Sequence, residues 1–134
     1  MSVEKVNPES LGKASGYSHG VRVGELLFIS GQIGAVPRGD GRHTVVSKEF
    51  VPQFKKALEN VVEVSKAAGG SAESIAEMTI YVKDMDAYRA ARKEIGEAWR
   101  KVLGKHYPAV TLVEVSDLFE DDTLVEIRAV AAVG

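Results

Sequence analysis

The chain has 134 residues, of which 45% are hydrophobic and 27% are charged, and its formal net charge is −2. This length supports one hydrophobic core, and the composition is that of a soluble globular protein, so residues 1–134 are expected to form a single domain. The acidic balance without a basic block argues against a nucleic-acid partner, and the absence of cysteine excludes disulfides and thiolate sites.

The first third of the chain has the pattern of short strands joined by turns. Strands are predicted at residues 1–6, 17–23 and 26–33. The third is a nearly continuous apolar run, which predicts a strand buried on both faces. Residues 34–45 hold four glycine or proline residues and several charges, so they are expected to form a loop and the most mobile part of the chain.

Two helices and a strand are expected next. The first helix is predicted from Ser47, as N-cap, to Ala68, because apolar residues recur at helical spacing and Gly69 follows. A strand at residues 74–82 combines β-branched and aromatic residues, and a second helix is expected over residues 86–103.

The last quarter contains two β-branched, apolar runs, residues 107–115 and 123–131, with an acidic connection between them. Glu114 and Glu126 lie inside these runs, where a carboxylate must find a partner or take part in chemistry. The order of elements suggests an α+β sandwich with both helices on one face of the sheet. The other face would then need a cover, which hints at oligomerisation.

Several short motifs stand out along the chain. They are Gly16-Tyr17-Ser18-His19, Ile29-Ser30-Gly31-Gln32-Ile33, Ala57-Leu58-Glu59-Asn60-Val61, Tyr81-Val82-Lys83-Asp84, Pro108-Ala109-Val110-Thr111-Leu112-Val113-Glu114-Val115 and Val125-Glu126-Ile127-Arg128-Ala129. Together they resemble the Rid family (YjgF/UK114), whose best-known members are enamine/imine deaminases. The resemblance implies a chorismate-mutase-like sandwich with a mixed six-stranded sheet. It also implies a homotrimer with a small-molecule pocket between subunits and no cofactor.

Carried over residue by residue, the resemblance places the water-positioning glutamate at Glu126 and ligand-binding groups at Tyr17, Ser30, Gly31 and Thr111. In the deaminases an arginine after Pro-Ala pairs with the carboxylate of the substrate. This chain has Val110 there, and a valine cannot hold a carboxylate.

Arg92 stands where many deaminases have an asparagine of the second helix. One hypothesis is that Arg92 reaches into the pocket and supplies the missing cation. The alternative is an ordinary arginine on a solvated helix face. Glu126 likewise has two interpretations, a pocket carboxylate or an ion-pair partner.

The three histidines are scattered without a second ligand at metal-binding spacing, so no metal site is expected. The first residues lack the apolar segment of a signal peptide and no stretch approaches the length of a membrane span. A cytoplasmic protein without a membrane partner is therefore expected. Three functions remain open: an imine or enamine hydrolase with an altered substrate, a non-catalytic metabolite-binding protein, and a scaffold trimer.

Overall fold

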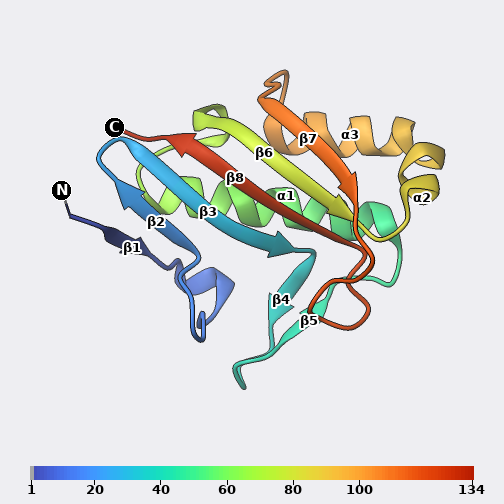
Figure 1. The fold of residues 1–134 in the computed structure, drawn as a ribbon, viewed down its shortest axis with the longest axis horizontal. Coiled ribbons are helices and arrows are strands. Elements are labelled where there is room, and N and C mark those ends of the chain that lie inside the picture. The colour runs from blue at the N-terminus through green and yellow to red at the C-terminus, as the bar shows by residue number, and fades with distance from the viewer. Residues whose placement is uncertain (1) are drawn as a thin grey trace.

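The computed structural model describes residues 2–134, and its central element is a mixed six-stranded sheet (Figure 1). The strand order is β1-β2-β3-β8-β6-β7. The strands are β1 (Glu4–Val6), β2 (Gly20–Val23), β3 (Leu26–Ile33), β6 (Ile75–Val82), β7 (Ala109–Glu114) and β8 (Val125–Ala132). Neighbouring strands are antiparallel except β6 and β7, which are parallel. The predicted mixed sheet is confirmed.

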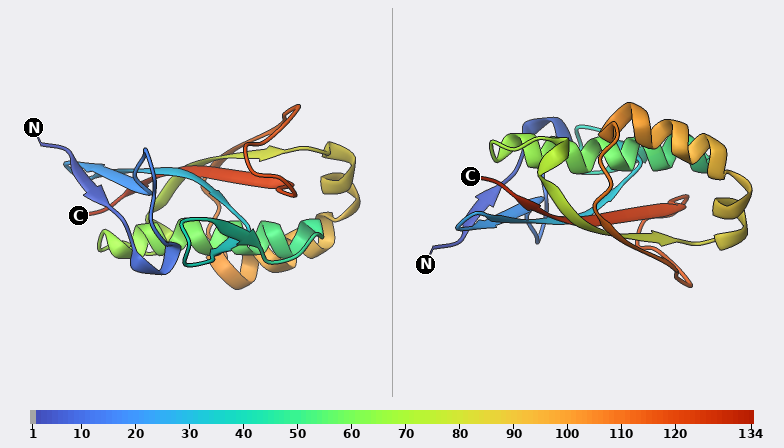
Figure 2. Two further views of the ribbon diagram at one scale, coloured as in Figure 1. Left: turned by 90° about the horizontal axis from the view of Figure 1, so that it is seen from below. Right: turned by 90° about the horizontal axis from the view of Figure 1, so that it is seen from above.

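Two helices, α1 (Phe50–Ala67) and α3 (Arg92–Leu103), lie on the same face of the sheet in both side views of Figure 2. The core lies between this helical layer and the sheet, and the α1 side chains Phe54, Leu58 and Val61 are fully buried in it. A shorter helix, α2 (Met85–Ala90), follows β6, and single 3-10 turns occupy Glu9–Leu11 and Ala72–Ser74. The predicted α+β sandwich with its helices on one face is confirmed.

None of the helices within residues 2–134 combines the length and the apolar character needed to cross a bilayer.

Both predicted helices differ from the structure at one point. The first begins at Phe50 with Glu49 as N-cap, because Ser47 lies farther back and its Oγ accepts a hydrogen bond from the Glu49 backbone N–H at 3.0 Å. The second predicted helix is interrupted at Ala91, which ends α2 and precedes the first residue of α3. Ala91 carries no local helix-breaking signal. The interruption accompanies tertiary packing, since Tyr88 contacts the Phe50 and Phe54 rings edge-on.

The segment predicted as a loop at residues 34–45 contains a two-stranded antiparallel ribbon, β4 (Ala35–Pro37) and β5 (His43–Val45), outside the main sheet (Figure 1). Gly34, Gly39 and Gly41 lie in bends, but Pro37 is itself the last residue of β4 and pairs with His43. The turn residues predicted the break in the chain and hid the short strands beside it.

β3 is not buried on both faces within one chain. Leu27 and Ile29 point into the core and are at most 2% exposed, whereas Leu26 and Phe28 are 47% and 42% exposed. The alternation places Leu26 and Phe28 on the sheet face opposite the helices. The continuous apolar run therefore reflects one face packed on helices and a second apolar face that a single chain leaves open.

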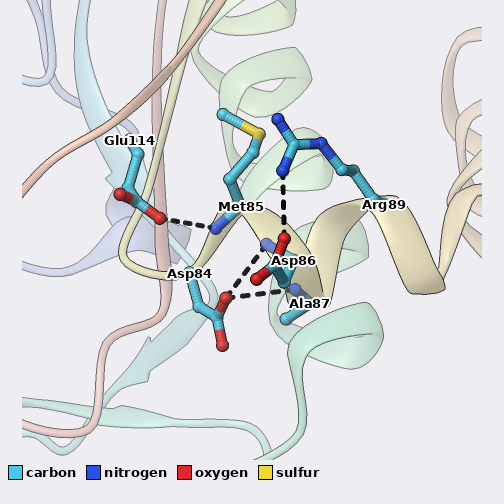
Figure 3. A network of polar contacts seen from close by, with 6 residues as sticks. All are labelled: Asp84, Met85, Asp86, Ala87, Arg89 and Glu114. Carbon is cyan, nitrogen blue, oxygen red and sulfur yellow. Dashed lines mark hydrogen bonds and ion pairs between the residues drawn. The ribbon is translucent and has the colours of Figure 1, made fainter.

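Glu114, one of the two strand glutamates, has a structural role. Its Oε1 accepts the backbone N–H of Met85 at 2.9 Å, at the start of α2 (Figure 3). Asp84 caps the same helix by accepting the N–H groups of Asp86 and Ala87, and Arg89 pairs with Asp86. Glu114 thereby satisfies a helix donor that would otherwise lack a partner.

Gln53 ties the beginning of α1 to the connection between β7 and β8. Its side chain is fully buried, and Nε2 donates to the carbonyls of Ser47 and Asp122 at 2.8 and 2.9 Å. Oε1 accepts the N–H of Leu124 at 2.8 Å. Asp122 has a positive φ of 65°, so the chain turns sharply where this amide holds it.

We expect Gln53→Leu to lower the free energy of unfolding by about 2–4 kcal/mol, because three backbone groups lose a buried partner. Urea unfolding followed by circular dichroism measures this loss. Lys66→Leu, at an exposed position of the same helix, is the control and should change stability by no more than about 0.5 kcal/mol. A loss below about 1 kcal/mol for Gln53→Leu would contradict the role assigned to the amide.

Candidate functional site

A cavity of about 320 Å³ lies at the end of β3, between the segment before β2 and the connection from β7 to β8. Its lining comes from segments far apart in sequence. The lining residues are Leu11, Tyr17, His19, Ser30, Gly31, Gln32, Ile33, Ala35, His43, Asn60, Phe119, Glu120 and Glu126. This volume is at the lower end of the range for small-molecule sites.

A β-bulge shapes the floor of the cavity. Along the β3–β8 ladder Ile29 pairs with Ala129 and Gln32 pairs with Ile127, so Ser30 and Gly31 together stand opposite one residue of β8. The next pair along the ladder joins Ile33 to Glu126. A Cβ atom at Gly31 would overlap the Glu126 carboxyl group. Glycine at position 31 therefore makes the room in which this carboxylate lies.

Glu126 carries an acidic group without a protein partner. Among residues 2–134, no hydrogen bond or ion pair engages its carboxyl, and Arg128, two residues along β8, pairs with Glu77 instead. Burial disfavours the charged form and raises the pKa of Glu126 above its ordinary value of 4.5. An unpaired carboxyl with a raised pKa in a cavity is suited to accept a proton from a bound water molecule.

Tyr17 stands at the opening of the same cavity. Its side chain is 51% exposed, and its ring lies edge-on to that of His19 with the centroids 5.6 Å apart. Burial, and then the charges of Glu120 and Glu126, raise the pKa of the Tyr17 hydroxyl. The hydroxyl therefore stays protonated and can donate a hydrogen bond at neutral pH.

A buried polar chain holds the cavity wall in place. His19 Nε2 donates to the Gly12 carbonyl at 3.1 Å, and Gln32 Nε2 lies 3.4 Å from His19 Nδ1 and 3.2 Å from the Ser30 carbonyl. The Ser30 hydroxyl donates to the Ser18 carbonyl at 2.5 Å, and the Ser30 N–H to the His19 carbonyl at 2.8 Å. Burial lowers the pKa of His19, so this imidazole is uncharged.

The structure thus brings four of the predicted site residues, Tyr17, Ser30, Gly31 and Glu126, to one cavity. The wall residues His19, Gln32, Asn60 and Glu120 were not singled out as site residues from the sequence. For Gln32 a signal is present in the sequence, because it directly follows Gly31 within a family motif. Nothing local distinguished Glu120 from the other acids of its connection.

The other three predicted site residues do not line this cavity. Val110 and Thr111 lie on β7, which β6 separates from β8, and Val110 is 44% exposed. Val110 pairs with Met78, whose partner on β8 is Ala129 rather than Glu126. Arg92 is exposed at the first turn of α3. Within one chain these residues are therefore apart from the cavity carboxylate.

In the part of the chain that the structure describes, no three histidine or acidic side chains are arranged to hold a metal ion. The cavity brings together two carboxylates, those of Glu120 and Glu126, with Tyr17 near both.

Comparison with known proteins gives this arrangement a context. Residues 8–133 match the model of the family described as endoribonuclease L-PSP. A RutC family protein of Pyrococcus horikoshii is 34% identical over 115 residues, which cover 86% of this chain and 85% of the relative. TdcF of Escherichia coli K12, which carries the provisional name of reactive intermediate deaminase, is 31% identical over 118 residues, 86% of this chain and 84% of that protein.

Solved structures agree in fold over nearly the whole length. The crystal structure of E. coli TdcF with bound serine superposes with a TM-score of 0.81 and 26% identity, covering 98% of this chain and 99% of that one. The E. coli YjgF gene product gives a TM-score of 0.81 and 28% identity, covering 96% and 98%. With its motifs, sheet order and family-model match in agreement, this chain belongs to the endoribonuclease L-PSP family, the Rid (YjgF/UK114) proteins.

Proposed function

We propose that this protein hydrolyses small imines or enamines, releasing ammonia, in the cavity that contains Glu126. The observation that carries the proposal is the unpaired Glu126 carboxyl, whose pKa burial raises, lying over Gly31 in a cavity with the Tyr17 hydroxyl. The similarity to TdcF, with its provisional deaminase name and its serine-bound structure, supports a small-molecule site.

The chemistry asks little of the protein beyond positioning. Deprotonated Glu126 accepts a proton from a water molecule as the water oxygen bonds to the imine carbon. The same carboxyl returns this proton to the nitrogen, which gives a carbinolamine. It then moves the hydroxyl proton of the carbinolamine to the nitrogen, so that the carbon–nitrogen bond breaks and a carbonyl product and ammonia leave. The Tyr17 hydroxyl is near enough to both cavity carboxylates to take part in orienting the water or the substrate.

Val110 argues for a substrate other than the usual amino-acid-derived imine. Without a guanidinium at this position, a 2-imino acid loses a bidentate, charge-assisted pair. The apolar residue also keeps a second function in view, in which the cavity binds a metabolite without turning it over. Ammonia release separates the two functions. The acidic cavity wall gives no support for cleavage of RNA, whose phosphates need positive charge.

The proposed assembly is a homotrimer. Leu26 and Phe28 leave an apolar patch on the sheet face opposite the helices, and such a patch on a small protein is a candidate for an interface between copies. In a trimer, β7 of one copy could complete the cavity of another, which is how Val110 and Thr111 would come to lie near Glu126.

Glu126→Gln should lower the rate of ammonia release by about 10²- to 10⁴-fold, because the amide cannot accept the proton from water. Ammonia from enzymatically generated 2-iminopropanoate and from carboxylate-free imines is the measurement. For the unsubstituted protein, the rate should rise with pH as Glu126 loses its proton, with a midpoint above 4.5 because burial raises the pKa. Glu73→Gln, an exposed acid away from the cavity, is the control. Equal rates for both variants would exclude Glu126 as the base.

A second experiment restores the arginine that binds the substrate carboxylate in the deaminases. Val110→Arg should lower the KM for 2-iminopropanoate by on the order of tenfold to a hundredfold, the value of a charge-assisted pair. Arg92→Ala should leave that KM unchanged, because Arg92 is exposed and lines no part of the cavity in its own chain. A large rise in the KM for 2-iminopropanoate in Arg92→Ala would instead establish that Arg92 of a neighbouring copy binds the substrate.

Light scattering after size-exclusion chromatography should give three times the 14.4 kDa mass of one chain. Phe28→Glu should shift the population to smaller species, since a charge would be buried between copies without a partner. Ala67→Glu, which adds the same group at an exposed position of α1 in the helical layer, should not. A single-chain mass for the unsubstituted protein would contradict the trimer.

A further inference from the structure

Among the aspartate, glutamate, lysine and arginine side chains, the cavity wall holds acids alone. Glu120 comes from the β7–β8 connection and Glu126 from β8, while no lysine or arginine is among the lining residues. His19 adds no positive charge, because burial lowers its pKa. An anionic ligand entering this wall meets repulsion from both carboxylates, whereas a cation meets attraction from both.

The hydrogen-bonding groups of the wall have the same bias. The side-chain donors of the wall already have acceptors within the chain. Gln32 Nε2 donates to the Ser30 carbonyl and lies within hydrogen-bond distance of His19 Nδ1. The Ser30 hydroxyl donates to the Ser18 carbonyl, and His43 Nε2 donates to the Leu11 carbonyl. Only the Tyr17 hydroxyl remains as a side-chain donor in this lining. A ligand is therefore offered acceptors far more than donors.

Asn60 is an independent observation of the same kind. It is 4% exposed and lines the cavity, and its Nδ2 donates to the carbonyls of Ile33 and Ala35 at 3.0 and 3.2 Å. Those two carbonyls fix the orientation of the amide, since a flipped amide would bring oxygen against oxygen. Its Oδ1 is buried and has no partner in the described chain, so it is an acceptor that lacks a donor.

We propose that this cavity selects a positively charged imine that has no carboxylate, and that Glu120 is a specificity-determining residue for that charge. The proposal rests on the imine hydrolysis proposed above and names its substrate class. A protonated imine presents N–H donors and a positive charge to a wall of unpaired acceptors. Val110 replaces the arginine that binds the substrate carboxylate in the deaminases, so a substrate without a carboxylate loses no contact there.

The reaction balances without a further reactant. Water adds its oxygen to the carbon of the protonated imine, the carbon–nitrogen bond breaks, and the nitrogen leaves as ammonium with both water protons. The positive charge passes from the iminium to the ammonium ion, so the cavity holds one unit of positive charge from substrate to product. Two nearby carboxylates stabilise that charge throughout.

Stable probes of matched shape test the charge preference without turnover. Benzamidinium carries the positive charge of a protonated imine on a planar amidinium group, benzoate is of similar size with the opposite charge, and benzamide is neutral. Calorimetric titration should give benzamidinium an affinity on the order of tenfold or more above benzoate, with benzamide between them. Glu120→Gln should weaken benzamidinium by about two- to fivefold, as expected for one partly solvated charge. Asp121→Asn removes the neighbouring charge, which lies outside this cavity, and should leave the affinity unchanged.

A pair of substrates separates this inference from the proposed hydrolysis. An amine oxidase acting on benzylamine supplies benzaldimine, and a D-amino acid oxidase acting on D-phenylglycine supplies 2-imino-2-phenylacetate, which differs by its carboxylate. Faster hydrolysis of benzaldimine, with the benzamidinium preference, supports both proposals. Benzamidinium binding without hydrolysis of either imine overturns the hydrolysis and leaves the charge preference. Hydrolysis that favours the carboxylate-bearing imine, equal or tighter binding of benzoate, or no binding of any probe overturns the charge preference.

Discussion

The site depends on a close approach between a side chain and a backbone: the Glu126 carboxyl lies where a Cβ of residue 31 would be. Two features of β3 make this possible. The bulge at Ser30 and Gly31 changes the pairing with β8, and glycine removes the atom that would collide. The carboxyl then lies in a partly buried cavity without a partner, a position that costs stability and raises its pKa. A group kept in such a position is free to act on a bound molecule.

The fold could be predicted from the sequence to a large extent, because periodicity reports which faces are buried. The strand at residues 75–82 and the two C-terminal strands were predicted within two residues of their observed bounds, and α1 was correct in type. The errors arose where tertiary contacts outweigh local signals. Ala91 interrupts a helix that its sequence would continue, and the β4–β5 ribbon lies between turn residues that resemble a loop.

The site could be predicted only where family motifs mark it. The motifs pointed to Gly31 and Glu126, but the role of Glu120 depends on the path of a connection that has no periodicity. Asn60 lies within one of the family motifs, but its role was not predicted, because on α1 it occupies a buried position within an otherwise apolar stripe. Its importance follows from an unpaired oxygen, and pairing is a property of three-dimensional contacts. Likewise, no single-chain view brings Val110 to Glu126, since β6 lies between their strands.

The connection from β7 to β8 is held at both ends, and residues 119–122 between them are exposed. Lys83 pairs with Asp117 at one end, the Gln53 amide fixes Asp122 and Leu124 at the other, and Phe119 between them is 94% exposed. Residues 118–121 therefore form a short surface segment outside the hydrophobic core. Substitutions or insertions there, in evolution or by design, would change the length and charge of the cavity wall and leave the core packing intact. Ligand preference can thus diverge between proteins that share this fold.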